Sequence, residues 1–347
     1  MSRPTSTERP PADVSALIDS YDAALFDLDG VVYLGPTAVP GAVEGIAALR
    51  ARGAKLGYVT NNAARPPGVV ADHLRELGID TTAEDVVTSA QAAARLLVDR
   101  FGDGARVLVV GGEGILAALA EVGLVGVRSA DDAPVAVIQG YSFDLAWEQL
   151  NEAAIAIQRG AHWVATNTDS TRPTDRGIVP GNGAAVDAVG QAVDVDPEVA
   201  GKPFRPLMEV TMARLGANHP IFVGDRIDTD IAGAGAVGID SLFVLTGAHG
   251  PQDLLEARAG ERPTHIGLNL AALLAPVRRV ERVVNRVICG DMSAVASDGA
   301  IAVKPTPQNP EERVDALWAV TQLYWDSQDR ARRLDPTSAL TALEGLT

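Results

Sequence analysis

The stretch Ala23-Ala24-Leu25-Phe26-Asp27-Leu28-Asp29-Gly30 decides the fold of this chain, because it is a short apolar run that ends in two carboxylates two residues apart. A short apolar run bounded by polar residues is typical of a buried strand. Downstream, residues 41–50 carry apolar side chains at helical spacing, and residues 55–59 form a second apolar run that ends at Thr60. Strands that alternate with helices predict right-handed βαβ units on a parallel sheet.

The same alternation continues to about residue 275, and it includes a strand at 221–223 that ends in Gly224-Asp225. We therefore expect an α/β protein with a Rossmann-like parallel-sheet core over residues 13–87 and 200–275, interrupted by an inserted α/β domain over 88–199. Residues 1–12 are predicted to be disordered. Residues 276–347 predict a small C-terminal α+β appendage, with a hairpin of 286–289 and 300–303 around Ser297-Asp298-Gly299 and a helix over 310–330.

The composition of the 347-residue chain narrows the class of protein. It has 29 Lys and Arg against 45 Asp and Glu, a net charge of −16, which argues against nucleic-acid binding and against a polybasic membrane anchor. The single cysteine, Cys289, excludes an internal disulfide. Residues 1–11 lack the apolar core of a secretory signal, and the apolar stretch 107–127 is interrupted by Glu113 and Glu121. We expect a soluble, cytoplasmic protein.

Polar residues follow three of the predicted strands. The first strand ends in Asp27 and Asp29, the second in Thr60-Asn61-Asn62, and the third in Asp225, with Asp228 and Asp230 close behind. In open parallel sheets the ligand site lies outside the carboxyl ends of the strands, so these groups are expected at one rim. Carboxylate oxygens with room for water and phosphate are the ligands that Mg²⁺ prefers. The sequence therefore predicts a magnesium site at this rim.

Two further groups suit an anionic ligand there. Thr60 offers a hydroxyl followed by backbone N–H groups that can cradle an anion, and Lys202 offers a compact positive charge before a predicted helix. Singly, each motif has an ordinary explanation as a loop, a turn or a helix start. Their order and their places at strand ends favour phosphoryl chemistry. Gly201-Lys202 is not a P-loop, because residue 196 is Asp and residue 203 is Pro, and the glycines at 111–114 predict a plain βα turn.

On these residues the chain resembles the haloacid dehalogenase superfamily of phosphotransferases. Asp27-Leu28-Asp29-Gly30 resembles the first motif of that superfamily, Thr60 the second, Lys202 the third, and Gly224-Asp225 through Asp230 the fourth. The long insert between the second and third motifs is similar to a C2-type cap. Segments 109–114, 165–169 and 180–183 resemble the NagD-like and p-nitrophenylphosphatase subfamily. The resemblance covers about residues 20–270 and leaves residues 276–347 outside it.

The resemblance implies a role for each acidic residue. Asp27 would be the nucleophile that forms an aspartyl-phosphate. Asp29 would protonate the leaving oxygen and then act as a base on water. Mg²⁺ would be bound by the Asp27 side chain, the Asp29 carbonyl and Asp225. Asp228 and Asp230 would orient the waters of the metal or the nearby lysine.

The resemblance also implies how the phosphoryl group would be held. Thr60, Asn61, Asn62 and Lys202 would bind the group while it is transferred. Discharge of the phosphoenzyme to water would make the chain a phosphatase. Discharge to a second sugar hydroxyl would instead make it a mutase or a kinase-like enzyme. A non-catalytic regulatory module acting through residues 276–347 is a further alternative.

The polar segment 167–176 of the cap is the predicted specificity loop, in which Asn167, Asp169 and Arg172 could hydrogen-bond a small hydroxylated or carboxylated substrate. An enclosing cap favours a small phosphorylated metabolite, and among the substrates of the family we expect glycerol 3-phosphate. The alternatives are phosphoglycolate, pyridoxal phosphate and nucleotides. An aromatic content of 4% argues against stacking a nucleobase or a pyridoxal ring.

The helix predicted over 310–330 carries Trp318, Tyr324 and Trp325. These aromatic side chains either pack in the core or form an exposed patch that would support a homodimer. Cys289 is expected to be a small buried residue.

Overall fold

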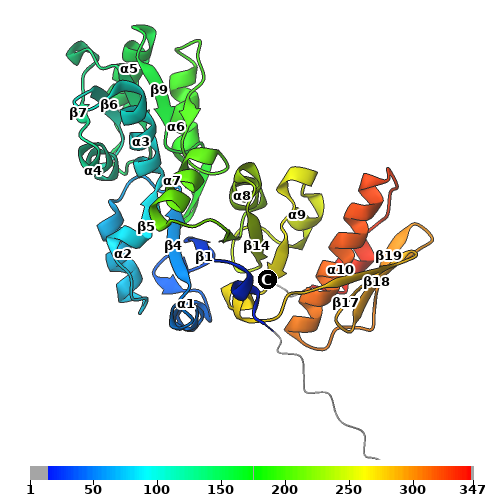
Figure 1. The fold of residues 1–347 in the computed structure, drawn as a ribbon. Coiled ribbons are helices and arrows are strands. Elements are labelled where there is room, and N and C mark those ends of the chain that lie inside the picture. Colours follow the sequence, from blue (N-terminus) through cyan, green and yellow to red (C-terminus); the bar gives the residue numbers. More distant parts are fainter. Residues whose placement is uncertain (1–14, 175, 345–347) are drawn as a thin grey trace, which may run out of the picture.

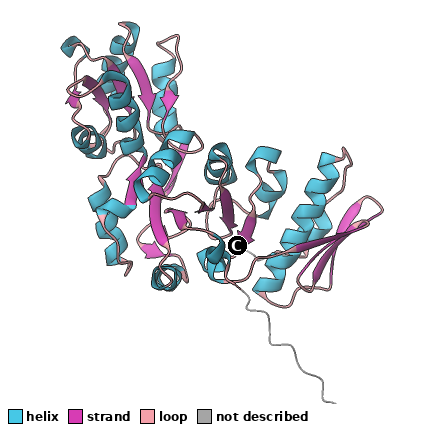
Figure 2. Ribbon diagram, viewed as in Figure 1, coloured by secondary structure: helices cyan, strands magenta, loops and turns pink. Residues whose placement is uncertain are grey.

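The computed structural model describes residues 15–174 and 176–344 and confirms the predicted α/β fold, shown in Figures 1 and 2. The disorder predicted for residues 1–12 lies outside the described residues. The centre of the fold is a six-stranded parallel sheet in the order β15-β14-β13-β1-β4-β5. Its strands are β1 (Ala23–Asp27), β4 (Lys55–Thr60), β5 (Val86–Thr88), β13 (Pro220–Gly224), β14 (Asp240–Val244) and β15 (His265–Gly267). The three strands singled out in the sequence are therefore neighbours at the middle of one sheet.

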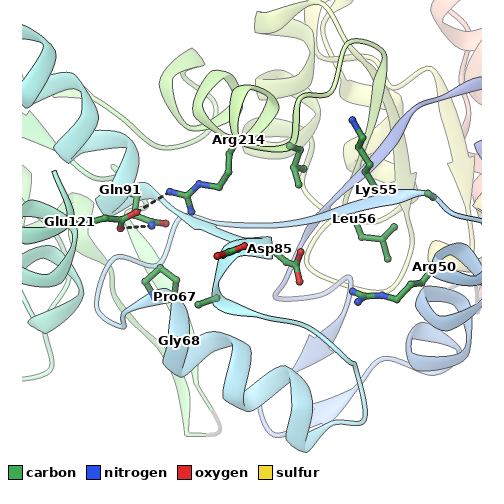
Figure 3. A pocket seen from close by; sticks show the side chains of 13 residues that line it. Arg50, Lys55, Leu56, Pro67, Gly68, Asp85, Gln91, Glu121 and Arg214 are labelled. Atoms are coloured by element: carbon green, nitrogen blue, oxygen red, sulfur yellow. Dashed lines mark hydrogen bonds and ion pairs between the residues drawn. The ribbon is translucent and has the colours of Figure 1, made fainter.

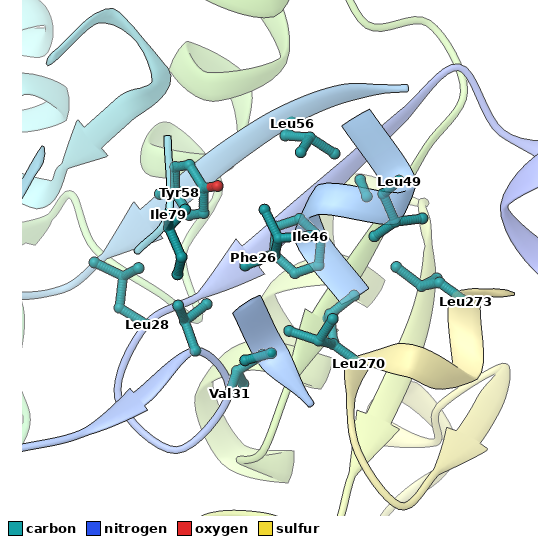
Figure 4. Close-up of a cluster of buried hydrophobic side chains, with 14 of the residues drawn as sticks. Phe26, Leu28, Val31, Ile46, Leu49, Leu56, Tyr58, Ile79, Leu270 and Leu273 are labelled. Carbon is teal, nitrogen blue, oxygen red and sulfur yellow. The ribbon is translucent and has the colours of Figure 1, made fainter. Parts of the chain in front are cut away.

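Helices cover the core sheet and bury its side chains. The helix α1 (Ala42–Ala51) places Ala42, Gly45, Ile46 and Leu49 on its buried face, which is the spacing of an amphipathic helix. Figure 4 shows Ile46 and Leu49 packed beside Phe26 of β1 and Tyr58 of β4, all of them buried. The other core helices are α2 (Pro67–Glu76), α7 (Arg205–Leu215), α8 (Ala232–Val237) and α9 (Pro251–Glu256). The short hairpin β2 (Tyr33–Leu34) and β3 (Thr37–Ala38) follows β1.

A second parallel sheet lies within the inserted segment, in the order β12-β9-β8-β6-β7. Its strands are β6 (Arg106–Val110), β7 (Val125–Val127), β8 (Ala136–Gln139), β9 (His162–Ala165) and β12 (Glu198–Val199). Its helices are α3 (Ser89–Phe101), α4 (Glu113–Glu121), α5 (Trp147–Gln158) and α6 (Asn182–Gly190). The hairpin of β10 (Thr171–Thr174) and β11 (Gly177–Pro180) extends from this unit. In Figure 1 the inserted sheet and the C-terminal appendage lie on opposite sides of the core.

The inserted unit touches the core through a glycine-rich turn between β6 and α4. A Cβ at Gly114 would lie 2.3 Å from the Ala63 oxygen and 2.8 Å from the Arg65 carbonyl carbon, so only glycine fits there. The Gly114 amide donates to the Ala64 carbonyl at 3.2 Å. The core loop after β4 thus packs directly against the start of α4, which agrees with the plain βα turn predicted for residues 111–114.

The appendage corrects the sequence prediction in one respect. Its sheet has four antiparallel strands, β16 (Val280–Val283), β17 (Arg286–Cys289), β18 (Met292–Ser297) and β19 (Ala300–Lys304). The predicted turn around Asp298-Gly299 is present, but it joins β19 to β18, and β17 pairs with the other side of β18. The predicted direct pairing of 286–289 with 300–303 is therefore wrong. The predicted helix is present as α10 (Pro310–Asp329) and is followed by α11 (Thr337–Thr341).

The helix α10 packs the appendage onto the core. Trp318 and Trp325 are each 4% exposed, and their rings meet edge to face with centroids 5.8 Å apart. The Trp325 indole donates to the Leu255 carbonyl of α9 at 3.2 Å. These tryptophans therefore belong to the core, and the alternative of an exposed aromatic patch is wrong. The homodimer stays a prediction. Cys289 is buried, as predicted. Among the described residues, no helix combines the length and the apolar character that crossing a bilayer requires.

Candidate active site

The carboxyl ends of two adjacent core strands bring the predicted acidic groups together. Asp27 is the last residue of β1, and Asp225 directly follows β13, its neighbour in the sheet. Asp230 reaches the same point from the helical turn Ile227–Ile231. One carboxylate oxygen from each of Asp27, Asp225 and Asp230 lies within 4.8 Å of the other two. The convergence predicted for groups far apart in the sequence is therefore present.

Lys202 lies inside this acidic cluster. Its ammonium Nζ lies 2.5 Å from Asp27 Oδ1 and 2.7 Å from Asp230 Oδ1, and its side chain is 2% exposed. Burial alone would lower the pKa of Lys202, but Asp230 and Asp27 outweigh it and raise that pKa. Lys202 is therefore a fixed cation between two buried carboxylates.

The cluster still carries more negative than positive charge. Three ionised carboxylates and one ammonium leave a net −2, which is costly away from water. Burial and the nearby Asp230 raise the pKa of Asp27, and the same two causes raise the pKa of Asp225 to about 7. Asp225 Oδ1 is buried and has no hydrogen-bond partner among the described residues, whereas its Oδ2 accepts from the Ala248 amide at 2.6 Å. An orphaned oxygen in an electron-rich cluster fits a hard divalent cation.

Asp230 and Asp228 differ in what they touch. Asp230 Oδ2 accepts from the backbone amides of Asp225 and Arg226 at 3.2 and 3.1 Å, so this carboxylate holds both the loop and Lys202. The side chain of Asp228 is 55% exposed and pairs with the Arg226 guanidinium at 2.9 Å. The structure therefore does not bring Asp228 to the cluster. Residues two apart on a helical turn point to opposite sides, which explains the difference.

Asp29 and Thr60 lie beside the cluster. The side chain of Asp29 reaches solvent, yet desolvation by the protein around it raises its pKa against the opposing charges of Lys202 and Arg172. Thr60 ends β4 and is 4% exposed, and its Oγ1 accepts from the Asn62 amide at 3.0 Å. Asn62 itself is exposed at the surface of the loop. Asp29 is thus a carboxyl at the open side of the site whose pKa the surrounding protein raises above its ordinary value.

The three residues predicted in the cap loop have different partners. Asn167 is buried, and its Nδ2 donates to the Asn61 carbonyl of the core at 2.7 Å, so it fastens the cap loop. Asp169 lies 3.4 Å from the Asn61 carboxamide, and burial raises its pKa against the charge of Arg226. The guanidinium of Arg172 lies 4.9 Å from the Tyr141 ring centroid. Asp169 and Arg172 both act electrostatically on the core site, Asp169 on Arg226 and Arg172 on Asp29.

One part of the site was missed in the sequence. The segment 246–248 follows β14 at the same rim: Thr246 Oγ1 donates to the Gly30 carbonyl at 2.5 Å, and Ala248 holds Asp225. A Cβ at Gly247 would lie 1.9 Å from Asp225 Oδ2, so the close approach requires glycine. The rule that ligand sites follow strand ends could have found this segment.

A cavity of about 800 Å³ lies elsewhere, at the amino ends of β4 and β5 (Figure 3). It is lined by Lys55, at the opposite end of β4 from Thr60, and by both cationic and anionic side chains. In it, Arg214 of α7 approaches Glu121 of α4 at 3.3 Å, and Gln91 donates to the same carboxylate at 2.8 Å. The contact between Arg214 and Glu121 joins the core to the inserted unit, and the residues that line the cavity are not those of the acidic cluster.

The comparisons with known proteins agree with this geometry. Residues 24–125 match a family described as haloacid dehalogenase-like hydrolase, and residues 199–273 match one described as HAD-hydrolase-like. A D-glycerol 3-phosphate phosphatase of Mycobacterium tuberculosis is 48% identical over 260 residues, which are 75% of this chain and 73% of the relative. The chain belongs to the haloacid dehalogenase-like hydrolases. Within this family, an acid sugar phosphatase of Staphylococcus aureus is 37% identical over 67% of this chain and 90% of its own length.

Solved structures of these hydrolases extend the comparison. The glycerol phosphate phosphatase of Mycobacterium tuberculosis in complex with magnesium has a TM-score of 0.83 at 39% identity, covering 96% of this chain and 100% of that one. The p-nitrophenyl phosphatase of Archaeoglobus fulgidus has a TM-score of 0.68 at 28% identity, covering 73% and 98%. Because the first alignment leaves only 4% of this chain uncovered, it includes most of residues 276–347.

Proposed function

We propose that this hydrolase is a magnesium-dependent phosphatase that cleaves glycerol 3-phosphate through an aspartyl-phosphate on Asp27. The observation that carries the proposal is the buried cluster of three carboxylates in which Lys202 lies between Asp27 and Asp230. The named activities of the relatives from Mycobacterium tuberculosis and Staphylococcus aureus support a small phosphate ester as the substrate.

Asp27 is the nucleophile in this proposal. A carboxylate oxygen of Asp27 attacks phosphorus while the ester P–O bond breaks, and the departing alkoxide takes a proton from Asp29. A pKa raised above the ordinary value suits Asp29 to the role of proton donor. A water molecule then attacks the phosphorus of the aspartyl-phosphate and gives its proton back to Asp29. Inorganic phosphate leaves, and Asp27 returns to its starting state.

The charges of the site hold the phosphoryl group during both steps. Lys202 offers its ammonium, and Thr60, Asn61 and Asn62 offer a hydroxyl and backbone amides at the end of β4. Asp27, Asp225 and the Asp29 carbonyl would hold Mg²⁺. When bound, the cation offsets the negative charge of the cluster and of the phosphate oxygens. Asp230 acts as a positioning residue, because it fixes Lys202 and the backbone at Asp225.

In this proposal the cap selects the substrate by contacting its leaving alcohol. Asp169 and Arg172 act on the core site from the cap and can hydrogen-bond the hydroxyls of a small polyol. The Arg172 guanidinium lies 4.9 Å from the Tyr141 ring centroid and 5.4 Å from the Phe143 ring centroid, so it covers one face of each ring. The buried, unpaired Cys289 fits a reducing compartment, and we propose a cytoplasmic location.

The experiment that tests the function measures phosphate release from a panel of esters with Mg²⁺ present. We expect kcat/KM to be highest for glycerol 3-phosphate, by at least about tenfold, which is the discrimination that one added hydrogen bond of about 1.4 kcal/mol provides. Phosphoglycolate, pyridoxal 5′-phosphate and a nucleoside monophosphate are the competitors. A higher kcat/KM for any of them would overturn the substrate, and transfer of phosphate to an added sugar would indicate a mutase.

Removal of the metal is expected to abolish this activity. Without the cation, the phosphate dianion meets three buried carboxyl groups that face a single ammonium, and their negative charge repels it. Excess EDTA should reduce phosphate release to background, and added Mg²⁺ should restore it. Turnover that continues undiminished in excess chelator would refute the metal assignment.

Gly247→Ala is expected to lower kcat by about 100-fold, since a shift of about 1 Å in a catalytic group has that effect. The added Cβ would lie 1.9 Å from Asp225 Oδ2, so the carboxylate must move. The measurement is kcat at saturating substrate over a titration of Mg²⁺. Gly190→Ala is the matched control, because nothing lies within 4 Å of the Cβ that it adds. Equal activity of the two variants would contradict the role of Asp225.

A further inference from the structure

The side chain of Asn61 makes an unusual contact between two segments of the core. Its Oδ1 accepts from the Lys202 backbone amide at 2.8 Å, and its Nδ2 donates to the Lys202 carbonyl at 3.0 Å. One carboxamide therefore hydrogen-bonds both the backbone amide and the backbone carbonyl of Lys202, 141 positions away in the sequence; we call this pair of bonds the grip of Asn61 on Lys202. This contact was not expected, because Asn61 was assigned only the binding of phosphate.

The neighbouring sequence is adapted to that grip. A Cβ at Gly201 would lie 2.6 Å from Asn61 Oδ1 and 2.4 Å from the Thr166 carbonyl oxygen. Glycine at position 201 therefore lets the carboxamide reach the backbone of the next residue. Since the main-chain position of Lys202 sets where its flexible four-carbon stem can place Nζ, the grip also fixes the ammonium between Asp27 and Asp230.

Asn61 also faces the cap. Its backbone carbonyl accepts from Asn167 Nδ2 at 2.7 Å, and its own Nδ2 lies 3.4 Å from Asp169 Oδ2. Both Asn167 and Asp169 belong to the cap loop predicted to select the substrate. The same residue thus contacts the loop that reads the leaving group and the lysine that holds the phosphoryl group.

We propose that Asn61 is a positioning residue whose carboxamide couples the seating of the cap loop to the position of Lys202. When the cap loop is seated, Asn167 and Asp169 fix Asn61, and Asn61 in turn fixes Lys202. A substrate whose alcohol seats the cap therefore gains a better placed ammonium, which a bare phosphate does not. This inference rests on the proposed phosphatase function.

The first test compares Asn61→Ala with Asn269→Ala. Asn269 also joins two segments by its carboxamide, since it donates to the Pro40 carbonyl and accepts from the Ala271 amide, but it lies away from the cluster. We expect Asn61→Ala to lower kcat for glycerol 3-phosphate by about 100-fold, because a misplaced catalytic group has that cost, and to weaken inhibition by inorganic phosphate. Asn269→Ala should leave kcat and the inhibition constant of inorganic phosphate within about threefold of the wild-type values, because the substitution lies outside the site.

Asn61→Asp keeps the size of the side chain and is used if Asn61→Ala fails to fold. The carboxylate still accepts from the Lys202 amide, but it repels the Lys202 carbonyl and the Asp169 carboxylate. We expect Asn61→Asp to lower kcat and the double variant Asn61→Asp/Asp169→Asn to recover only part of the loss. The second substitution removes the repulsion from the cap carboxylate but not the repulsion from the Lys202 carbonyl. Full restoration would overturn the grip on Lys202.

The second test is a double-mutant cycle between Asn61→Ala and Asp169→Asn. The readout is the ratio of kcat/KM for glycerol 3-phosphate to that for p-nitrophenyl phosphate, whose alcohol cannot hydrogen-bond the cap as a polyol does. Coupling predicts that Asp169→Asn lowers this ratio less in Asn61→Ala than in the wild type, and the effect that remains in Asn61→Ala measures the direct contact of Asp169 with the polyol. Additive effects would overturn the coupling.

The two claims fail in different ways. A wild-type protein without magnesium-dependent phosphate release from either ester would refute the proposed function. An active wild type in which Asn61→Ala behaves like Asn269→Ala would refute this inference alone.

Discussion

Asp27→Asn is expected to abolish turnover while leaving the fold intact. The amide has the shape of the carboxylate but cannot form an acyl phosphate, so the covalent step is lost. Hydrolysis of phosphate monoesters is among the slowest uncatalysed reactions, with enhancements up to ~10²¹-fold, of which general acid–base catalysis supplies only ~10²–10⁴-fold. The remaining groups therefore cannot sustain measurable phosphate release. The measurement is kcat for glycerol 3-phosphate, together with the free energy of unfolding in urea.

The stability of this variant gives a second check. Burial and Asp230 raise the pKa of Asp27, which means that its charge opposes folding near neutral pH. Removing the charge should leave the free energy of unfolding unchanged or higher. Asp240→Asn is the control, because Asp240 bonds to Tyr21 at the opposite, amino end of the core sheet. An active Asp27→Asn protein, or an equal loss of activity in Asp240→Asn, would refute the nucleophile.

The core fold is predictable because each of its elements carries a local signal. Apolar runs and amphipathic spacing place β1, β4 and α1 within one or two residues of the observed bounds. The appendage sheet is not predictable in this way, because β18 (Met292–Ser297) consists mostly of small and hydroxylated residues and its sequence resembles that of a loop. Its burial between β17 and β19 and under α10, rather than its propensity, makes it a strand. The sequence signal that could have revealed β18 is the turn at Gly290-Asp291, which separates it from β17.

The site is predictable to the extent that it follows from sheet topology. The carboxyl ends of adjacent strands locate Asp27, Thr60 and Asp225 without coordinates. Spacing alone could not tell that Asp230 faces Lys202 while Asp228 pairs with Arg226. The grip of Asn61 depends on a contact across 141 positions, which no local pattern encodes.

Lys202→Met is expected to remove activity and to destabilise the protein by about 3–5 kcal/mol, the cost of breaking a buried ion pair by removing one partner. The methionine fills the space but leaves Asp27 and Asp230 facing each other without a cation. Lys202→Arg should also be inactive, because a planar guanidinium does not replace an ammonium in so tight a site. The measurements are kcat and urea unfolding, with Lys55→Met as the control. Lys55 is exposed and donates to the Gly216 carbonyl at the surface, so its loss should cost at most about 0.5 kcal/mol.

The pH dependence of the Lys202→Met variant has a definite sign. Loss of the ammonium raises the pKa values of the buried carboxyls further, so the folded state binds more protons than the unfolded state. The pKa of Asp225 is about 7 with the lysine present and lies higher without it, so the free energy of unfolding of the variant should rise as pH falls from above 7 toward the unperturbed value of 3.8. Mg²⁺ should restore part of the lost stability at pH 7, and so should Asp230→Asn in the same chain, because each removes excess negative charge. Equal stability of Lys202→Met and Lys55→Met at neutral pH would show that the cluster does not depend on its lysine.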